Sequence, residues 1–319
     1  MANPVVKLVA QRVALGILLL LAASVLIFVG TQILPGDVAQ SILGQSATPQ
    51  ALANLRAQLG LDQPAYIRYF TWLGGAIHGD FGTALTNGQD IATAVGRRLS
   101  NTLFLAAVAA VIAVPLAIVL GLIAVRYQGR WPDKLISAVT LASVSLPEFL
   151  LGYIIIFFLA VQFHVAPSVS TIFPGMGFWA KLHAVVLPAL VLVLVVQGQM
   201  MRMTRAAVLN LMQSAYIETA ELKGLRPFLI IVRHAFPNAI SPIVNVVMIN
   251  LAYLVVGIVV TEVVFVYPGM GQYLVDHVAK RDVPVVQACG LIFAAVYIGL
   301  NMLADVISIL TNPRLRHPK

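Results

Sequence analysis

Long apolar runs constrain this chain more than any other feature of its sequence. Lipid offers no hydrogen-bond partners to an open backbone, so a run of about 20 apolar residues crosses a membrane as a helix. The chain contains six such runs, at about residues 9–34, 99–125, 135–163, 181–201, 240–265 and 285–310. We therefore expect an all-α polytopic membrane protein with six transmembrane helices.

Composition argues against a soluble protein. Of the 319 residues, 60% are hydrophobic and only 10% are charged, whereas soluble domains carry about 25% charged residues. The net charge of +8 could indicate a nucleic-acid partner, but the basic residues lie beside apolar runs and form no stripe with interleaved aromatics. We expect contact with lipid and none with nucleic acid. The first run follows Lys7 and Arg12 and is too long for the apolar region of a signal peptide, so we expect it to be a retained span.

The basic residues also predict the orientation of the helices. Inner segments of membrane proteins are enriched in Lys and Arg. If the N-terminus is cytoplasmic, the outer segments hold 7 of the 20 Lys and Arg residues and the inner segments hold 13. The inner residues are Lys7, Arg12, Arg126, Arg130, Lys134, Arg202, Arg205, Lys223, Arg226, Arg233, Arg314, Arg316 and Lys319. Both termini are therefore predicted to be cytoplasmic.

The longest polar segment, residues 35–98, is then external. Its stretch "TPQALANLRAQLGL" has Thr48 as an N-cap candidate, Pro49 at the first helical position and Gly60 as a stop, and "YIRYFTWL" carries aromatics suited to a membrane interface. We expect short packed helices there. The predicted organisation is a first helix with an external helical loop over 1–98, followed by a five-helix core over 99–319.

Three polar side chains within the apolar runs are candidates for the translocation path. Pro147 predicts a kink in the third span, and Glu148 follows it. Glu148 either lines a path or bonds to backbone groups that the proline leaves free. Asp305, with Asn301 one turn earlier, either joins neighbouring helices through hydrogen bonds or takes part in transport.

An external turn is predicted after the fifth span. Glu262 ends that span, and "YPGMG" follows with Pro268, Gly269 and Gly271, so the chain must turn sharply. The turn is either purely structural or part of an external gate. Asp282 is placed to cap the start of the sixth span.

The polar stretch at 206–240 interrupts the chain between the fourth and fifth spans. Good helix formers over 206–223 predict a helix, Gly224 predicts its stop, and Pro227 predicts the start of a second helical piece. A polar helix under the membrane either receives a push from a soluble partner or only connects two spans.

The sequence lacks the usual motifs of metal binding, nucleophilic catalysis and ATP hydrolysis. The six histidines show no pair at i and i+4 and no cysteine cluster, so we expect no metal site. Nucleophile, base and orienting groups do not gather in any recognisable motif. The sequence also has no G-x-x-x-x-G-K-[ST] phosphate loop, so we expect no enzyme activity in this chain and, if ATP is used, hydrolysis elsewhere.

The polar stretch carries a family resemblance. Glu218-Thr219-Ala220, with Gly224 four residues later, resembles the EAA loop of ABC importer permeases. The segments "RMTRAAVLNLMQSAYIETAELKGL", "RHAFPNAISPIV", "TEVVFVYPGMGQYLVDHVAKRDVPVVQ", "NMLADVISILTNPRLR", "LPGD" and "HGDFGTAL" resemble the dipeptide/oligopeptide/nickel permease family nearly end to end. The chain departs from the family pattern at Thr219, where alanine is usual, and at Glu221.

The resemblance implies a type I ABC importer permease in the bacterial inner membrane. Its expected partners are a second homologous permease subunit, two ATPase subunits that bind ATP and Mg²⁺, and an external solute-binding protein. The EAA-like loop would be the coupling helix that meets the ATPase, through Tyr216, Glu218, Thr219, Ala220, Lys223, Gly224 and Arg226. The expected substrates are di- or oligopeptides, with glutathione or a nickel chelate as alternatives. The rival hypothesis is an ion-coupled secondary transporter that uses Glu148 or Asp305.

Overall fold

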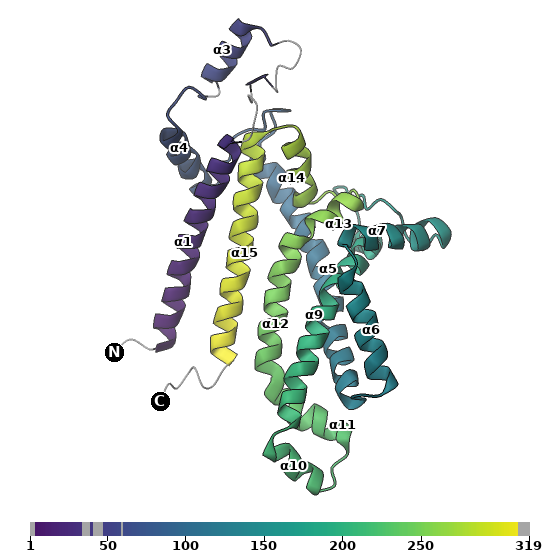
Figure 1. Cartoon of the computed structure of the whole chain (residues 1–319). Helices are drawn as coiled ribbons and strands as arrows, with labels where there is room; N and C mark the ends of the chain where they lie inside the picture. Colours follow the sequence, from purple (N-terminus) through teal and green to yellow (C-terminus); the bar gives the residue numbers. More distant parts are fainter. Residues whose placement is uncertain (1–3, 34–38, 41–46, 59, 312–319) are drawn as a thin grey trace.

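The chain is built from helices throughout the part that the structure describes. The computed structural model describes residues 4–33, 39–40, 47–58 and 60–311 (Figure 1). Within these ranges the only β-pairing is an isolated bridge between Thr83 and Asp90. The helices are α1 (Pro4–Ile33), α3 (Pro49–Gln58), α4 (Ala65–Ile77), α5 (Ile91–Arg126), α6 (Trp131–Ser145), α7 (Glu148–Ile155), η2 (Ile156–Gln162), α8 (Phe178–Ala184), α9 (Val186–Met212), α10 (Ala215–Leu222), α11 (Pro227–Leu229), η3 (Ile230–Ala235), α12 (Phe236–Gly257), α13 (Val259–Val264), α14 (Met270–Ala279) and α15 (Val283–Thr311).

Five helical segments are long and apolar enough to cross a membrane, and a bent pair supplies a sixth. The predicted all-α fold is confirmed. The third span differs from the expected kinked helix, because α6 and α7–η2 meet at 107°. Proline favours an extended conformation in the residue before it and has no N–H, and here both Leu146 (ψ 137°) and Pro147 (ψ 138°) leave the helical region. The chain therefore breaks at this point.

The fourth and fifth spans are longer than hydropathy predicts. The fourth was expected over 181–201, but α9 continues to Met212, because the arginines that end the apolar run are good helix formers. The fifth was expected from residue 240, but its helix starts at Pro227 and runs to Val264. The π-helical turn η3 precedes Pro237, so the second helical piece is the beginning of the fifth span itself.

Small residues bring α5 and α9 close together. Ala106, Ala109, Ala113 and Ala117 recur every three or four residues on α5 and are all buried. One turn further, a Cβ on Gly121 would lie only 2.9 Å from Thr204 Cγ2 on α9. Small side chains let helix backbones approach in a membrane, where packing replaces the hydrophobic effect as the main source of association. The α5–α9 pair forms the centre of the largest core cluster, which α12 joins.

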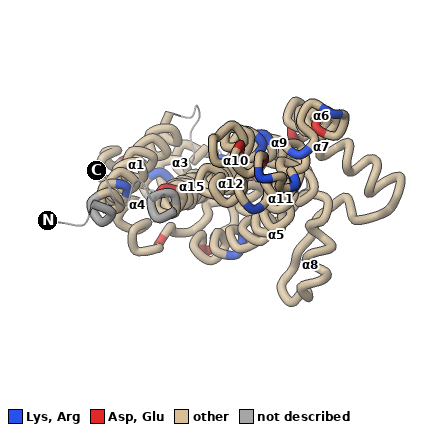
Figure 2. The backbone as a smooth tube through the Cα atoms, turned by 90° about the horizontal axis from the view of Figure 1, so that it is seen from below, with Lys and Arg blue, Asp and Glu red and all other residues tan. Residues whose placement is uncertain are grey.

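The two ends of the bundle differ. Figure 1 shows α10 and α11 beyond one end of α9 and α12, at the end where α1 starts and α15 stops, whereas α3 and α4 lie at the other end. We call the first the elbow end and the second the opposite end. Seen from the elbow end, Lys and Arg gather around α9, α11 and α6 (Figure 2).

We predict that Gly198→Ala destabilises the fold. A Cβ at this position on α9 would lie 2.5 Å from Val144 Cγ2 and 2.8 Å from the Thr140 carbonyl oxygen on α6. Overpacking of this kind costs about 1–3 kcal/mol. SDS titration of the purified protein should show unfolding at a lower SDS fraction.

The matched control is Gly96→Ala on α5, where a Cβ meets nothing within 4 Å. Alanine is the better helix former, so this variant should match or slightly exceed the stability of the parent. Equal stabilities of the two variants would contradict the proposed tight contact between α6 and α9.

Candidate functional site

The polar stretch between the fourth and fifth spans forms an elbow, which we define as residues 213–235. Helix α9 ends at Met212, and Ser214 is extended (ψ 148°), so the helix expected over 206–223 is divided in two. The second part is α10, whose last turn is followed by Gly224 at φ +76°. This is the left-handed conformation that glycine adopts without strain, and it confirms the predicted helix stop. The chain then re-enters a helix at Pro227.

One face of α10 is buried against the rest of the bundle. Ile217 and Ala220 are 0% and 6% exposed. They belong to a cluster, the elbow core, that joins α5, α9, α10, η3 and α12 and consists of Val125, Val208, Ile217, Ala220, Ile230, Ile231, Ala235, Ala239 and Ile243. A displacement of α10 must therefore move or disrupt the ends of three long helices, because packed interiors deform little.

Ala220 differs in placement from the other six coupling candidates. It faces its own chain, so its small side chain allows α10 to pack on the bundle and is not available to an outside partner. Tyr216, Glu218, Thr219, Lys223, Gly224 and Arg226 are all exposed. Two of these side chains make local hydrogen bonds: Thr219 Oγ1 donates to the Ala215 carbonyl at 3.0 Å, and Asn238 Nδ2 donates to the Tyr216 hydroxyl at 3.5 Å.

The structure adds two apolar residues that the sequence motif did not single out as contacts. Leu222 is 82% exposed at the end of α10, and Phe228 is 66% exposed on α11. Both lie among the exposed polar residues of the elbow. We call this surface the elbow face and define it by Tyr216, Glu218, Thr219, Leu222, Lys223, Gly224, Arg226 and Phe228. An apolar side chain directly before the Lys223-Gly224 stop was the signal that could have identified Leu222. Exposed apolar anchors within a polar rim are typical of protein contacts.

An ion pair links the elbow end of α9 to α6. Arg205 donates from Nε and Nη2 to the two carboxylate oxygens of Asp133 at 2.9 and 2.8 Å, and the Gly129 N–H donates to the same carboxylate at 2.9 Å. Asp133 is 5% exposed. A two-point pair fixes orientation as well as distance, so α6 follows α9 at this end.

At the opposite end, Glu262 organises the turn that follows α13. Its buried carboxylate accepts hydrogen bonds from Thr102 Oγ1 at 2.6 Å, from the Gly271 N–H at 2.7 Å and from the Gln272 N–H at 3.1 Å. Thr102 Oγ1 in turn accepts from the Met270 N–H at 2.8 Å. The carboxylate therefore joins α5, α13 and α14 into one network.

The glycines of "YPGMG" make room for this carboxylate. A Cβ on Gly269 would lie 1.9 Å from Glu262 Oε1, and a Cβ on Gly271 would lie 2.9 Å from Oε2. Pro268 is half-buried, and its carbonyl accepts from Asn101 Nδ2 at 2.9 Å. Three of the four residues expected at an external turn or gate, Glu262, Gly269 and Gly271, are thus interior and give the turn its shape.

The same turn is tied to α5 by a tyrosine. Tyr267 is fully buried, and its hydroxyl donates to the Asn101 carbonyl at 2.7 Å. Burial, with a smaller contribution from the Glu262 carboxylate, raises the pKa of Tyr267 above its ordinary value. The hydroxyl therefore stays protonated and remains a donor at any physiological pH.

The candidates for the translocation path are each engaged with a partner. Thr261 Oγ1 donates to Glu148 Oε1, so Glu148 joins α7 to α13. Asp305 forms an ion pair with Arg12 at 3.0 Å, which ties α15 to α1. Asn301 Nδ2 donates to the Tyr297 carbonyl at 2.9 Å in the same helix. The structure does not bring these three side chains together.

Known proteins match this chain along almost its whole length. Residues 113–317 match the family described as binding-protein-dependent transport system inner membrane component, and residues 5–113 match the family of its N-terminal part. The glutathione transport system permease protein GsiC of Escherichia coli strain K12 is 35% identical over 298 residues, which are 93% of this chain and 95% of that protein. GsiC of Shigella dysenteriae serotype 1 (strain Sd197) is similar to the same extent.

A solved structure shares the fold. One chain of the MetNI methionine ABC transporter, in an inward-facing conformation, matches with a TM-score of 0.50 and 19% identity. The match covers 70% of this chain and 96% of that chain.

We predict that Thr102→Val weakens the network around Glu262. The valine keeps the shape of the side chain but leaves the Glu262 carboxylate without one donor and the Met270 N–H without its acceptor. Buried groups without partners cost about 1–3 kcal/mol each. Titration with SDS should therefore show a loss of stability of about 2 kcal/mol or more.

Ser100→Ala is the control, since Ser100 lies on the same helix and is exposed. It should change stability by less than about 0.5 kcal/mol. A Thr102→Val protein as stable as this control would show that the carboxylate does not hold the turn together.

Proposed function

This chain belongs to the binding-protein-dependent transport system inner membrane component family and is a permease subunit of an ABC transporter, from which we infer that the elbow couples it to a separate ATPase. The observation that carries this proposal is the two-sided character of α10. Its inner face is locked into the elbow core, while Glu218, Leu222 and Lys223 on the elbow face are free to meet another protein. A rigid helix held in this way transmits force instead of absorbing it.

The proposed mechanism converts closure of two ATPase subunits into movement of the spans. ATP and Mg²⁺ bind in those subunits, which this chain would contact through α10 and α11. Displacement of α10 moves the elbow core and, with it, the ends of α5, α9 and α12. The Arg205–Asp133 pair carries α6 along with α9. Rigid-body movement of this kind alternates access between the two sides of the membrane.

In this proposal the elbow end faces the cytoplasm. The gathering of Lys and Arg around α9, α11 and α6 (Figure 2) supports it, because inner segments are enriched in basic residues. Helix α1 starts and α15 stops at that same end (Figure 1), so both termini would be cytoplasmic. The opposite end, with α3, α4 and α14, would face the external solute-binding protein.

The remaining partner is a second permease subunit of the same kind, and the two subunits together would enclose the path. We propose small peptides as the transported substrates. The name of the E. coli and Shigella relatives specifies glutathione, which is itself a tripeptide, so their identity of 35% supports this chemical class. The rival hypothesis, ion-coupled transport, would need Glu148 or Asp305 to exchange protons during transport, and each is bound to a partner residue.

We predict that Leu222→Asp weakens binding of the ATPase subunits. Leu222 is the most exposed large apolar side chain of the elbow face, and a carboxylate there would have to be desolvated in the contact. Co-purification of the ATPase subunits with the permease should fall at least about tenfold, which corresponds to a loss of about 1.4 kcal/mol.

Gln128→Asp is the control for Leu222→Asp. Gln128 is exposed in the turn after α5, so the substitution adds the same charge at the elbow end but outside the elbow. Co-purification should stay at the parent level. If both variants retain the ATPase subunits equally, the elbow face is not their docking surface.

We predict that Gly224→Val uncouples ATP hydrolysis from uptake. A Cβ at this position meets nothing within 4 Å, so the damage comes only from forcing a β-branched residue to φ +76° and thereby altering the turn. Proteoliposomes with the complete transporter should lose most substrate uptake per ATP hydrolysed, while the spans stay folded.

Gly175→Val is the control, because it also forces a β-branched residue into a positive-φ conformation. Gly175 has φ +86° and equally open surroundings, but it lies at the opposite end of the bundle before α8. Its uptake per ATP should equal that of the parent. An unchanged ratio in Gly224→Val would contradict the proposed role of the elbow.

A further inference from the structure

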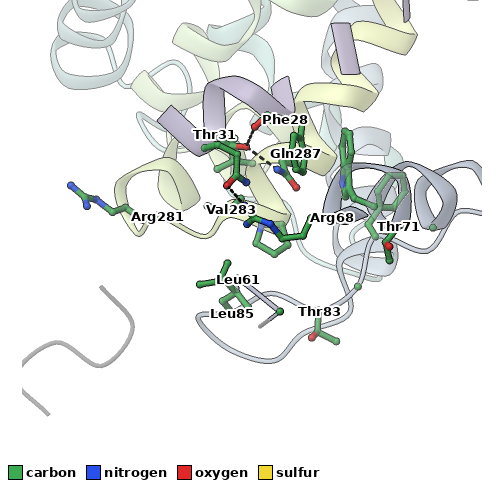
Figure 3. Close-up of a pocket in the computed structure, with 18 of the residues that line it drawn as sticks. Phe28, Thr31, Leu61, Arg68, Thr71, Thr83, Leu85, Arg281, Val283 and Gln287 are labelled. Carbon is green, nitrogen blue, oxygen red and sulfur yellow. Dashed lines mark hydrogen bonds between the residues drawn. The ribbon is translucent and has the colours of Figure 1, made fainter. Parts of the chain in front are cut away.

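A large cavity lies at the opposite end of the chain, away from the elbow. Its volume is about 720 Å³. Five segments line it: the end of α1, residues 60–63, helix α4, the loop over 80–85, and the junction of α14 with α15 (Figure 3). Neither the coupling mechanism nor the network around Glu262 uses this space.

Two hydrogen-bond donors on α4 line the cavity and lack partners. Arg68 Nε and Trp72 Nε1 are both buried without an acceptor. Arg68 donates from Nη2 to Gln32 Oε1 at 2.8 Å, so the guanidinium is held in place with its Nε free. A buried donor without a partner costs free energy, which indicates that an acceptor belongs beside it.

Two other polar side chains that line the cavity, Gln287 and Thr31, bond to each other. Gln287 Nε2 donates to Thr31 Oγ1 at 2.8 Å, and Thr31 Oγ1 donates to the Phe28 carbonyl at 2.8 Å (Figure 3). These bonds join α15 to α1 and do not involve the Arg68 or Trp72 N–H groups. Among the described residues that line the cavity, the two buried polar atoms without a partner are both donors, so the missing group is an acceptor.

Charge in the cavity favours an anion. Among the described residues, Arg68 forms no ion pair, although Asp80 also lines the cavity. One Asp80 oxygen accepts from the Gly82 N–H at 2.9 Å and so holds the loop in shape. Arg281 brings a second positive charge to the rim and points away from the other labelled side chains (Figure 3). A guanidinium with a free N–H edge is well suited to phosphate.

The position of the cavity favours a lipid as the source of that anion. Helix α1 is among the most lipid-exposed segments, with Leu26 and Ile33 72% and 74% exposed close to the cavity. Phe28, Tyr69 and Trp72 pack together there, with ring centroids 5.4 to 6.2 Å apart. Aromatic clusters of this kind mark the level of lipid headgroups.

We propose that this cavity binds the phosphodiester headgroup of an anionic phospholipid, with Arg68 and Trp72 donating to the phosphate oxygens. The acyl chains would continue along the exposed apolar surface of α1. The lipid would then fasten α4 to the edge formed by α1 and α15. A soluble phosphate or carboxylate could satisfy the same donors, but it would leave the apolar wall beside them without a partner.

Native mass spectrometry of the full-length chain tests the proposal. The protein is purified in detergent containing phosphatidylglycerol, and the lipid retained per chain is measured. We expect one tightly held phosphatidylglycerol in the parent. Arg68→Gln should weaken its retention at least about tenfold, since a bond to a charged group is lost, and Trp72→Phe should weaken it about fivefold. Lys280→Gln removes an exposed cation at the same end that does not line the cavity, and it should retain the lipid fully.

Folding and the source of the anion are controlled separately. Arg68→Lys keeps the charge and should recover part of the retention, and all variants should elute alike in size-exclusion chromatography. Equal retention in Arg68→Gln and Lys280→Gln would overturn the proposal, as would retention of diacylglycerol, which lacks a phosphate, to the same degree. Displacement of the lipid by inorganic phosphate or glycerophosphoglycerol at equal concentration would also overturn it, because the acyl chains would then contribute nothing.

Discussion

The close approach of α5 and α9 is the contact on which the rest of the bundle depends. Water does not drive helices together inside a membrane, so the association needs surfaces that fit. The alanine face of α5 and its continuation at Gly121 supply one such surface, and α12 completes the core around the pair. On the other side of α9, Gly198 lets α6 approach in the same way. Helix α9 thus touches the elements that move together in the proposed mechanism.

The two ends of this core are fastened by different chemistry. At the elbow end the fastening is mostly apolar, with one ion pair between α6 and α9. At the opposite end a buried carboxylate on α13 accepts hydrogen bonds from a hydroxyl group on α5 and from two backbone N–H groups on α14. Apolar contacts are non-directional, whereas hydrogen bonds also fix the direction from which the groups approach. The arrangement places apolar packing next to the proposed ATPase contact and a hydrogen-bonded turn at the far end.

Sequence patterns predicted local features of this fold and missed those that depend on distant residues. The apolar runs predicted the spans, and Gly224 predicted the helix stop, because both signals lie within a few residues. The role of Glu262 depends on Thr102, 160 positions away in sequence, which no local pattern can reveal. The inward placement of Ala220 likewise depends on how α10 packs. Hydropathy also ended the fourth span at its arginines, although backbone hydrogen bonding continues to Met212.

The break at Pro147 gives the molecule unequal hydrophobic lengths on its two flanks. Helix α6 has 15 residues and spans about 22 Å, whereas the apolar part of α1 has 26 residues and spans about 39 Å. A hydrocarbon core is about 30 Å thick, so α6 without its bent partner is too short to cross it, whereas α1 is long enough to tilt. Hydrophobic mismatch is thereby concentrated at the α6 edge, where local thinning of the bilayer or contact with another subunit would relieve it.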